Sequence, residues 1–74
     1  MKFRMLTSVV NRMADEFLNG NVVQHNGHRI HSMGVTGDVD HKMYVVVVLE
    51  RVTDGQKLVA IERDESLDME FSEI

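Results

Sequence analysis

Three of the four histidines in this chain follow one another at intervals of three residues, at His25, His28 and His31. Neutral imidazoles bind zinc and exchange protons near neutral pH, so this stretch is the part of the sequence closest to chemistry. Asn26-Gly27 separates the first two, and that dipeptide between β-forming residues is typical of a two-residue type I′ hairpin. We therefore expect His25 and His28 to face each other across the turn, with His31 on the opposite face.

His25 and His28 are the candidate metal ligands, but two imidazoles do not complete a zinc site. The nearest further donors are Asp38, Asp40 and His41 in the following loop, and nothing in the sequence requires them to converge. That loop, "GDVDH", also lacks the later glycine and the glutamate of a calcium-binding loop. We therefore expect exposed turn histidines and no cofactor, with histidine-based metal binding as an alternative. Because two protonated histidines repel each other, the hairpin could also loosen at about pH 6.

No catalytic motif is recognisable in the rest of the chain. The absence of cysteine excludes thiol nucleophiles, thiolate zinc sites and disulfides. The serines lie in no nucleophile elbow, and the glycines form neither a dinucleotide-binding fingerprint nor a phosphate-binding loop. A chain of 74 residues also leaves little room for a substrate pocket of roughly 300 Å³. We therefore expect a protein that is not an enzyme.

The net charge of −4 comes from the C-terminal part of the chain, where six acids between Glu62 and Ile74 face a single base, Arg63. The other bases are scattered and do not alternate with aromatic residues, so we expect no direct binding of nucleic acid. A nucleic-acid-binding regulator with a basic patch near the N-terminus is the alternative.

The acidic segment is the candidate contact surface, because exposed acids can dock on a basic protein and methionine adds adaptable apolar area. We therefore expect a small binding or regulatory protein that acts through protein–protein contacts. One concrete version is an acidic inhibitor of a nucleic-acid-processing partner, of the kind that viruses encode against host defences. The expected contact residues are Asp68, Met69, Glu70, Phe71 and Glu73.

The first segment of the fold is predicted to be helical. Apolar residues recur at helical spacing through "FRMLTSVVNRMADEF", which predicts a helix over about residues 3–19 that ends at Gly20. Two bases near its start and two acids near its end oppose the helix dipole. The alternative is a short strand over "MKFRM", with the helix beginning after Thr7.

The remaining segments are predicted to be strands. A hairpin over residues 21–33 and a second over residues 42–63, with its turn at "TDG", supply four. The acidic segment over residues 64–74 alternates apolar and acidic residues as an edge strand does, although part of it also shows helical spacing. The sequence thus predicts a single α+β domain over residues 1–74, in the order α-β-β-β-β. Its N-terminal helix packs on an antiparallel sheet of four strands, or five if the acidic segment joins.

The run "YVVVVL" does not alternate apolar and polar residues. Tyr44, Val46 and Val48 point to one face of a strand and the three residues between and after them to the other, so both faces require cover. One helix covers one face, and each large side chain left in water forfeits roughly 1.5–3 kcal/mol. We expect a second copy to provide the other cover, in a homodimer. The alternatives are the C-terminal segment folding back and a foreign partner.

The sequence also predicts a location. The N-terminus lacks the apolar run and small residues of a signal peptide. The longest apolar run, "MYVVVVL", is far shorter than the roughly 20 residues that a membrane helix needs. We therefore expect a soluble cytoplasmic protein that does not contact the membrane.

Overall fold

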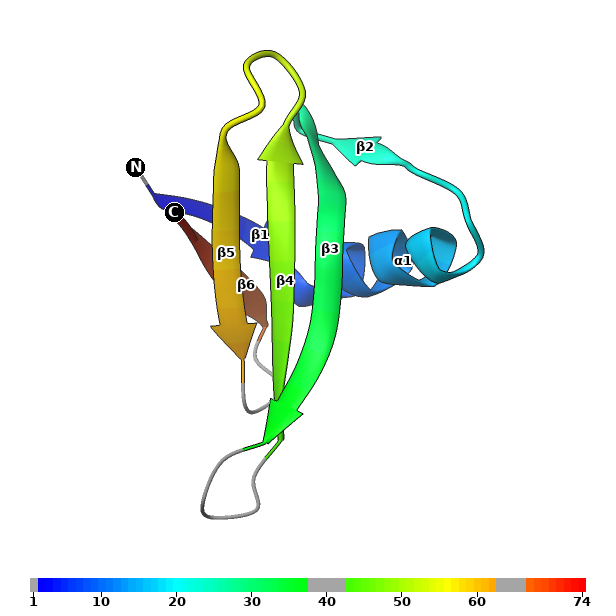
Figure 1. The fold of residues 1–74 in the computed structure, drawn as a ribbon, viewed down its shortest axis with the longest axis vertical. Coiled ribbons are helices and arrows are strands. Elements are labelled where there is room, and N and C mark those ends of the chain that lie inside the picture. The colour runs from blue at the N-terminus through cyan, green and yellow to red at the C-terminus, as the bar shows by residue number, and fades with distance from the viewer. Residues whose placement is uncertain (1, 38–42, 63–66) are drawn as a thin grey trace.

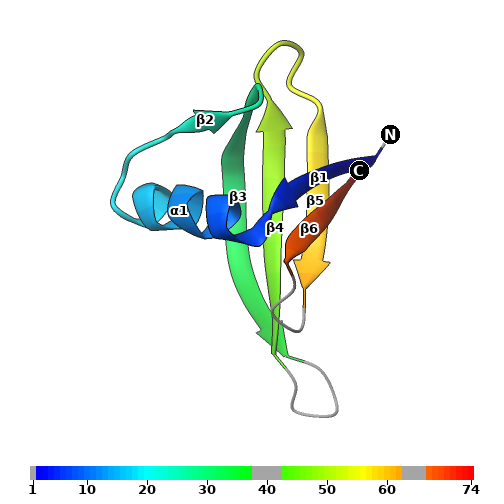
Figure 2. The same ribbon diagram turned by 180° about the vertical axis from the view of Figure 1, so that it is seen from behind.

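A computed structural model of the chain describes residues 2–37, 43–62 and 67–74. All six of its strands are antiparallel and form one curled sheet, in the order β1-β6-β5-β4-β3-β2, with a helix on one side (Figures 1 and 2). The predicted α+β class is confirmed, with six strands in place of four or five. No helix within the described ranges has the length and apolar character that crossing a membrane requires. The elements are β1 (Lys2–Leu6), α1 (Thr7–Leu18), β2 (Gln24–His25), β3 (His28–Gly37), β4 (Met43–Arg51), β5 (Lys57–Glu62) and β6 (Asp68–Glu73).

The N-terminal residues form a strand and not the first turn of a helix, so the predicted helix over residues 3–19 is wrong at its start. β1 pairs with β6, which places Arg4 opposite Glu70. The two bases, which would oppose the dipole if this segment were helical, instead lie beside acids of the paired strand β6. Pairing with acids is more favourable than opposing the helix dipole. α1 therefore begins at Thr7, whose amide donates to the Leu67 carbonyl oxygen at 2.9 Å. It ends at Leu18, and Gly20 takes the expected left-handed conformation with φ of 83°.

The hairpin after the helix turns at the predicted place but has unequal arms. Asn26 and Gly27 have φ of 49° and 75°, as a type I′ turn requires. β2 contains two residues, whereas β3 contains ten and runs on through residues 34–37, beyond the predicted hairpin over residues 21–33. β3 pairs with β4 over most of this length, with a bulge between Ile30 and Ser32. The outer edge of β3 is therefore paired by β2 only at its beginning.

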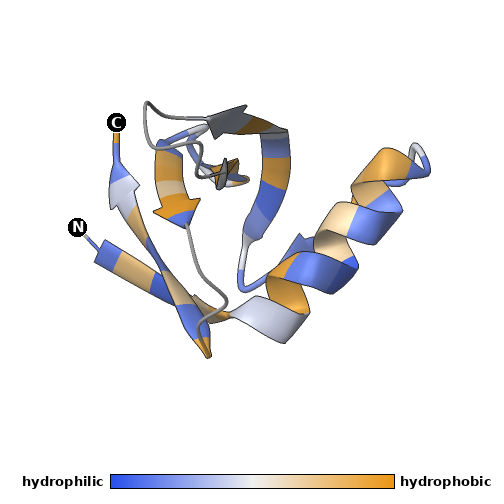
Figure 3. Cartoon of the chain, turned by 90° about the horizontal axis from the view of Figure 1, so that it is seen from below, coloured by the Kyte–Doolittle hydropathy of each residue, from blue (hydrophilic) through white to orange (hydrophobic). Residues whose placement is uncertain are grey.

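The core lies between α1 and the inner face of the sheet (Figure 3). Period-two alternation turns one residue in two of β4, β5 and β6 toward the helix. The acidic segment forms a strand, as predicted, but β1 rather than β6 occupies the sheet edge. Because β6 lies within the sheet, it does not fold back over the other face. The buried apolar residues are Met5, Val10, Met13, Ile30, Val47, Leu49, Leu58, Ala60, Met69 and Phe71.

Phe71→Ala removes a ring that is 0% exposed, and we expect it to lower the free energy of unfolding by about 3–5 kcal/mol. Ile74 is 74% exposed, so Ile74→Ala should change that free energy by less than about 0.5 kcal/mol. Urea unfolding at one protein concentration measures both. A helix over this segment would bury both side chains on one stripe, so an equally large loss for Ile74→Ala would contradict the strand.

Candidate interaction surface

The sheet has an outer face that is turned away from α1 (Figures 1 and 2). Apolar side chains of β4 and β5 point to this face. Val47 points inward, so its neighbours on β4, Val46 and Val48, point outward. Ile61 and Val59 on β5 lie opposite these two valines and share their face. On β3 the bulge shifts the alternation by one residue, so three small residues after it point outward, opposite the outward side chains of β4. We define the outer face as Ser32, Gly34, Thr36, Tyr44, Val46, Val48, Val59 and Ile61.

Among the large apolar side chains of the outer face, that of Ile61 is the most exposed. The Ile61 side chain is 61% exposed, and Val46, Val48 and Val59 are half-buried by their neighbours within the sheet. No element in the described part of the chain lies over these side chains. The outer face is therefore an apolar surface open to solvent, of the kind that marks interaction sites on small proteins.

A shallow hollow of about 200 Å³ lies beside these side chains, over β3 and β4. Gly34 is one of the residues that line it, stands opposite Val46 and contributes no side chain. A Cβ atom placed on Gly34 would meet no atom within 4 Å, so the hollow is empty space that a larger residue could fill. The outer face thus has two large apolar side chains on β5, Val59 and Ile61, and a hollow on β3. The hollow is lined by Ser32, Met33, Gly34, Val35, Thr36, Val46 and Val48.

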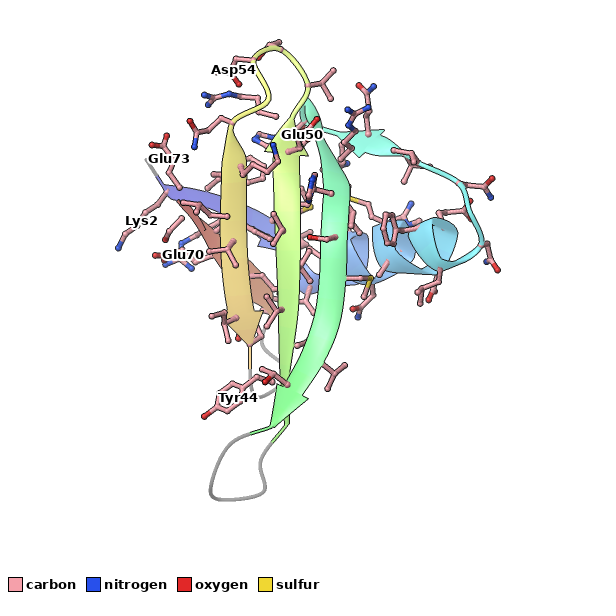
Figure 4. The ribbon with its side chains drawn as sticks, in the orientation of Figure 1. Lys2, Tyr44, Glu50, Asp54, Glu70 and Glu73 are labelled. Carbon is pink, nitrogen blue, oxygen red and sulfur yellow. The ribbon has the colours of Figure 1, made fainter. Side chains whose placement is uncertain are left out.

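Charged residues close one end of the outer face, at the opposite end of β4 from Tyr44 (Figure 4). Arg29, Glu50 and Lys57 stand side by side on β3, β4 and β5. The Arg29 guanidinium donates to Glu50 at 2.7 Å, and the Lys57 ammonium lies 3.4 Å from the other carboxylate oxygen. The hydrogen bond from Arg29, with a smaller contribution from Lys57, holds the pKa of Glu50 below its usual range. This end of the face is therefore charged but internally paired.

The five predicted contact residues divide between the two faces of β6. Met69 and Phe71 are buried in the core, which removes them from the exposed surface. Asp68 and Glu70 point outward, and Glu73 is exposed at the end of the strand. These three therefore remain predicted contacts.

The outward acids of β6 already have basic partners on β1 (Figure 4). The Arg4 guanidinium donates to Glu70 at 2.6 Å and to Asp68 at 3.3 Å. The Lys2 ammonium lies 3.2 Å from the second Glu70 oxygen. The acidity that is prominent in the sequence is therefore largely neutralised at this surface.

The structure places His25 opposite His28 across the turn, as predicted, but His28 is not an exposed turn residue. It is 5% exposed, and its ring stacks on Phe3 with a centroid separation of 4.3 Å. The position of Nδ1, 2.8 Å from the Asn26 carbonyl oxygen, makes it the hydrogen-bond donor, which leaves Nε2 as an acceptor. Nε2 is buried and has no hydrogen-bond partner among the described residues. His31 lies in the bulge and is exposed.

The described residues add no third ligand to the predicted pair of metal-binding histidines. The described ranges contain no group of three His, Cys, Asp or Glu side chains that could hold a metal ion. Asp38, Asp40 and His41, the further donors that the sequence offered, lie outside the described residues. His25 and His28 therefore stay a predicted pair.

The turn between β4 and β5 contains an ion pair that sequence analysis did not identify. The Arg51 guanidinium donates to both Asp54 carboxylate oxygens, at 2.9 and 2.7 Å, and the Gln56 amide donates to one of them at 3.0 Å. These hydrogen bonds, that from Arg51 foremost, lower the pKa of Asp54 to about 2. Gly55, with φ of 75°, completes the turn that "TDG" predicted. The arrangement orders the turn and offers no open site.

Sequence analysis also did not identify the hollow, although one signal for it was present. A glycine inside a strand indicates a bulge or a close approach by another group, and Gly34 is such a residue. The predicted hairpins, over residues 21–33 and 42–63, leave Gly34 outside any strand, so the sequence alone does not place it opposite a valine.

Comparisons with models of known protein families, with characterised proteins and with solved structures find no match for this chain.

Arg51→Ala should move the pKa of Asp54 partway from about 2 back toward 3.8, because the guanidinium is the largest cause of its depression. Since the folded-state pKa is the lower one, the stabilisation by this pair is present above about pH 4 and is lost as the pH falls toward 2. Carboxyl carbon shifts followed by NMR across the acid range measure the pKa directly. An unchanged midpoint for Asp54 would exclude Arg51 as the cause.

His28→Phe keeps a ring against Phe3 and removes the buried nitrogen that has no partner. We expect the free energy of unfolding to change by less than about 1 kcal/mol, because the lost Nδ1 hydrogen bond is offset by relief of the unpaired acceptor. His28→Ala, which leaves a cavity, should cost about 2–4 kcal/mol. Urea unfolding compares the two. Equal losses for both variants would contradict the expected relief from removing the unpaired Nε2 atom.

Proposed function

We propose that this protein is a non-enzymatic binding module that acts through protein–protein contacts, and that the outer face makes those contacts. The observation that carries this proposal is the exposure of Ile61 beside Val46, Val48 and Val59 on the face of the sheet opposite the core. Leaving such a cluster in water forfeits roughly 25 cal/mol for every Å² of apolar surface. Association with another protein surface recovers part of this free energy.

The acidic surface supports a partner less well than the outer face does. Asp68 and Glu70 are paired with Arg4 and Lys2, so a basic partner would have to displace bonds that already exist. The same pairs weaken the nucleic-acid alternative, because two of the N-terminal bases are engaged by β6. An inhibitor that mimics an acidic surface is therefore less well supported than a contact through the outer face.

A photo-crosslinking amino acid at position 61 tests this proposal without assuming a partner. Illumination of cells that produce the variant should yield covalent protein adducts, because position 61 is exposed at the centre of the proposed contact. The matched control carries the same amino acid at position 18, where Leu18 is 72% exposed on α1, on the other side of the sheet. Denaturing electrophoresis and mass spectrometry detect the adducts and identify them. The absence of any protein adduct specific to position 61 would exclude the outer face as a protein-binding surface.

A further inference from the structure

We infer that the protein bound by the outer face is a second copy of this chain, in a twofold sandwich in which the β5 side of each face fills the hollow of the other. This inference rests on the proposed function and adds the identity of the partner and the geometry of the contact.

The first reason is shape. Val59 and Ile61 stand on β5, the hollow at Gly34 lies on β3, and β4 runs between them. A twofold axis along β4 places β5 of one copy over β3 of the other, and the reverse contact follows from the same rotation. A single face therefore carries both the protruding part and the recess that receives it.

The second reason is charge. The outer face itself contains no charged residue, and the group at its end, Arg29, Glu50 and Lys57, is internally paired. Two copies can therefore approach through this face without bringing unpaired acids together, although each chain carries a net charge of −4. A nucleic acid or a strongly basic protein would find no complementary charge on it. The face suits an apolar and nearly neutral partner, and a second copy presents one.

The third reason is area. Taken over all nine residues of β4, and so including the paired charges at its end, the contact of β4 and its two neighbouring strands spans roughly 30 Å by 14 Å, from a rise of about 3.3 Å per residue and a strand spacing of about 4.8 Å. Two copies therefore bury about 850 Å² in flat projection, and the relief of the side chains adds to this. Stable interfaces bury about 1,200–2,000 Å², and smaller ones belong to weak complexes. We accordingly expect a reversible dimer with a dissociation constant in the micromolar range.

An edge-to-edge dimer is the competing geometry. β2 pairs with β3 only at His28 and Arg29, so the outer edge of residues 30–37 has no strand beside it in the described part of the chain. Open edges can pair with a second copy. That geometry would leave the outer face and its hollow in water.

Sedimentation velocity over a range of concentrations tests the inference with three variants. Gly34→Leu fills the hollow, and Ile61→Lys puts a charge on the β5 side. Each should raise the dimer dissociation constant at least about tenfold. Leu18→Lys, the matched control on α1, should leave it unchanged. Gly34→Leu meets no clash in the monomer, so its thermal unfolding at low concentration should be no lower than that of the unmodified protein.

The inference is overturned if the unmodified protein stays monomeric at concentrations well above the micromolar range. It is also overturned if Gly34→Leu dimerises as tightly as the unmodified protein.

Variants with a single cysteine distinguish the face-to-face sandwich from the edge-to-edge dimer, because the chain has no other thiol. With a short bismaleimide, the sandwich should link two copies of Val48→Cys and leave Val35→Cys, on the edge strand, unlinked. Linking at Val35→Cys alone would overturn the sandwich in favour of edge pairing. Adducts from position 61 to other proteins, without self-linking, would overturn this inference and leave the proposed function standing. The absence of both kinds of adduct would contradict this inference and the proposed function.

Discussion

The pairing of β1 with β6 is the interaction on which the rest of this structure depends. It joins the first and last segments of the chain, which lie more than sixty residues apart. On its inner side Phe3 packs near Phe71, with ring centroids 6.4 Å apart. On its outer side Arg4 and Lys2 neutralise the acids of β6. Because β1 is held in this way, the helix can only begin where the strand ends, at Thr7.

The same pairing determines which surface stays open. A sheet with an apolar central strand requires cover on both faces, and a chain of this length has one helix to offer in its described part. The C-terminal segment could have formed a second layer, but its place between β1 and β5 makes it part of the sheet. Val47 and Leu49 are therefore enclosed, whereas Val46 and Val48 remain on the outer face. The apolar surface is a consequence of strand order and not of an excess of apolar residues.

Net charge was a poor guide to the surface for a similar reason. Six acids near one end of the sequence suggest an acidic docking site, but the bases that neutralise Asp68 and Glu70 come from the opposite end. Ion pairs between exposed strands contribute little stability individually. Their larger effect here is on recognition, since they leave the β1–β6 surface nearly neutral.

The sequence by itself determined the local features of this protein. Asn26-Gly27, Gly20 and Gly55 lie where the chain turns with positive φ, because backbone sterics restrict such conformations to few residue types. The β-branched residues of the valine run and the alternation of apolar and acidic residues in the acidic segment correctly predicted strands.

Only the tertiary structure decided the strand order, the start of the helix, the burial of His28 and the hollow at Gly34. Each depends on which distant segments lie side by side, and a local pattern contains no information on that choice. The spacing of the N-terminal apolar residues fits a helix as well as a strand. The strand is favoured because the bases of this segment pair with the acids of β6. The hollow exists because the register places Gly34 opposite Val46, a pairing that requires the whole of β3 and β4 to be in position.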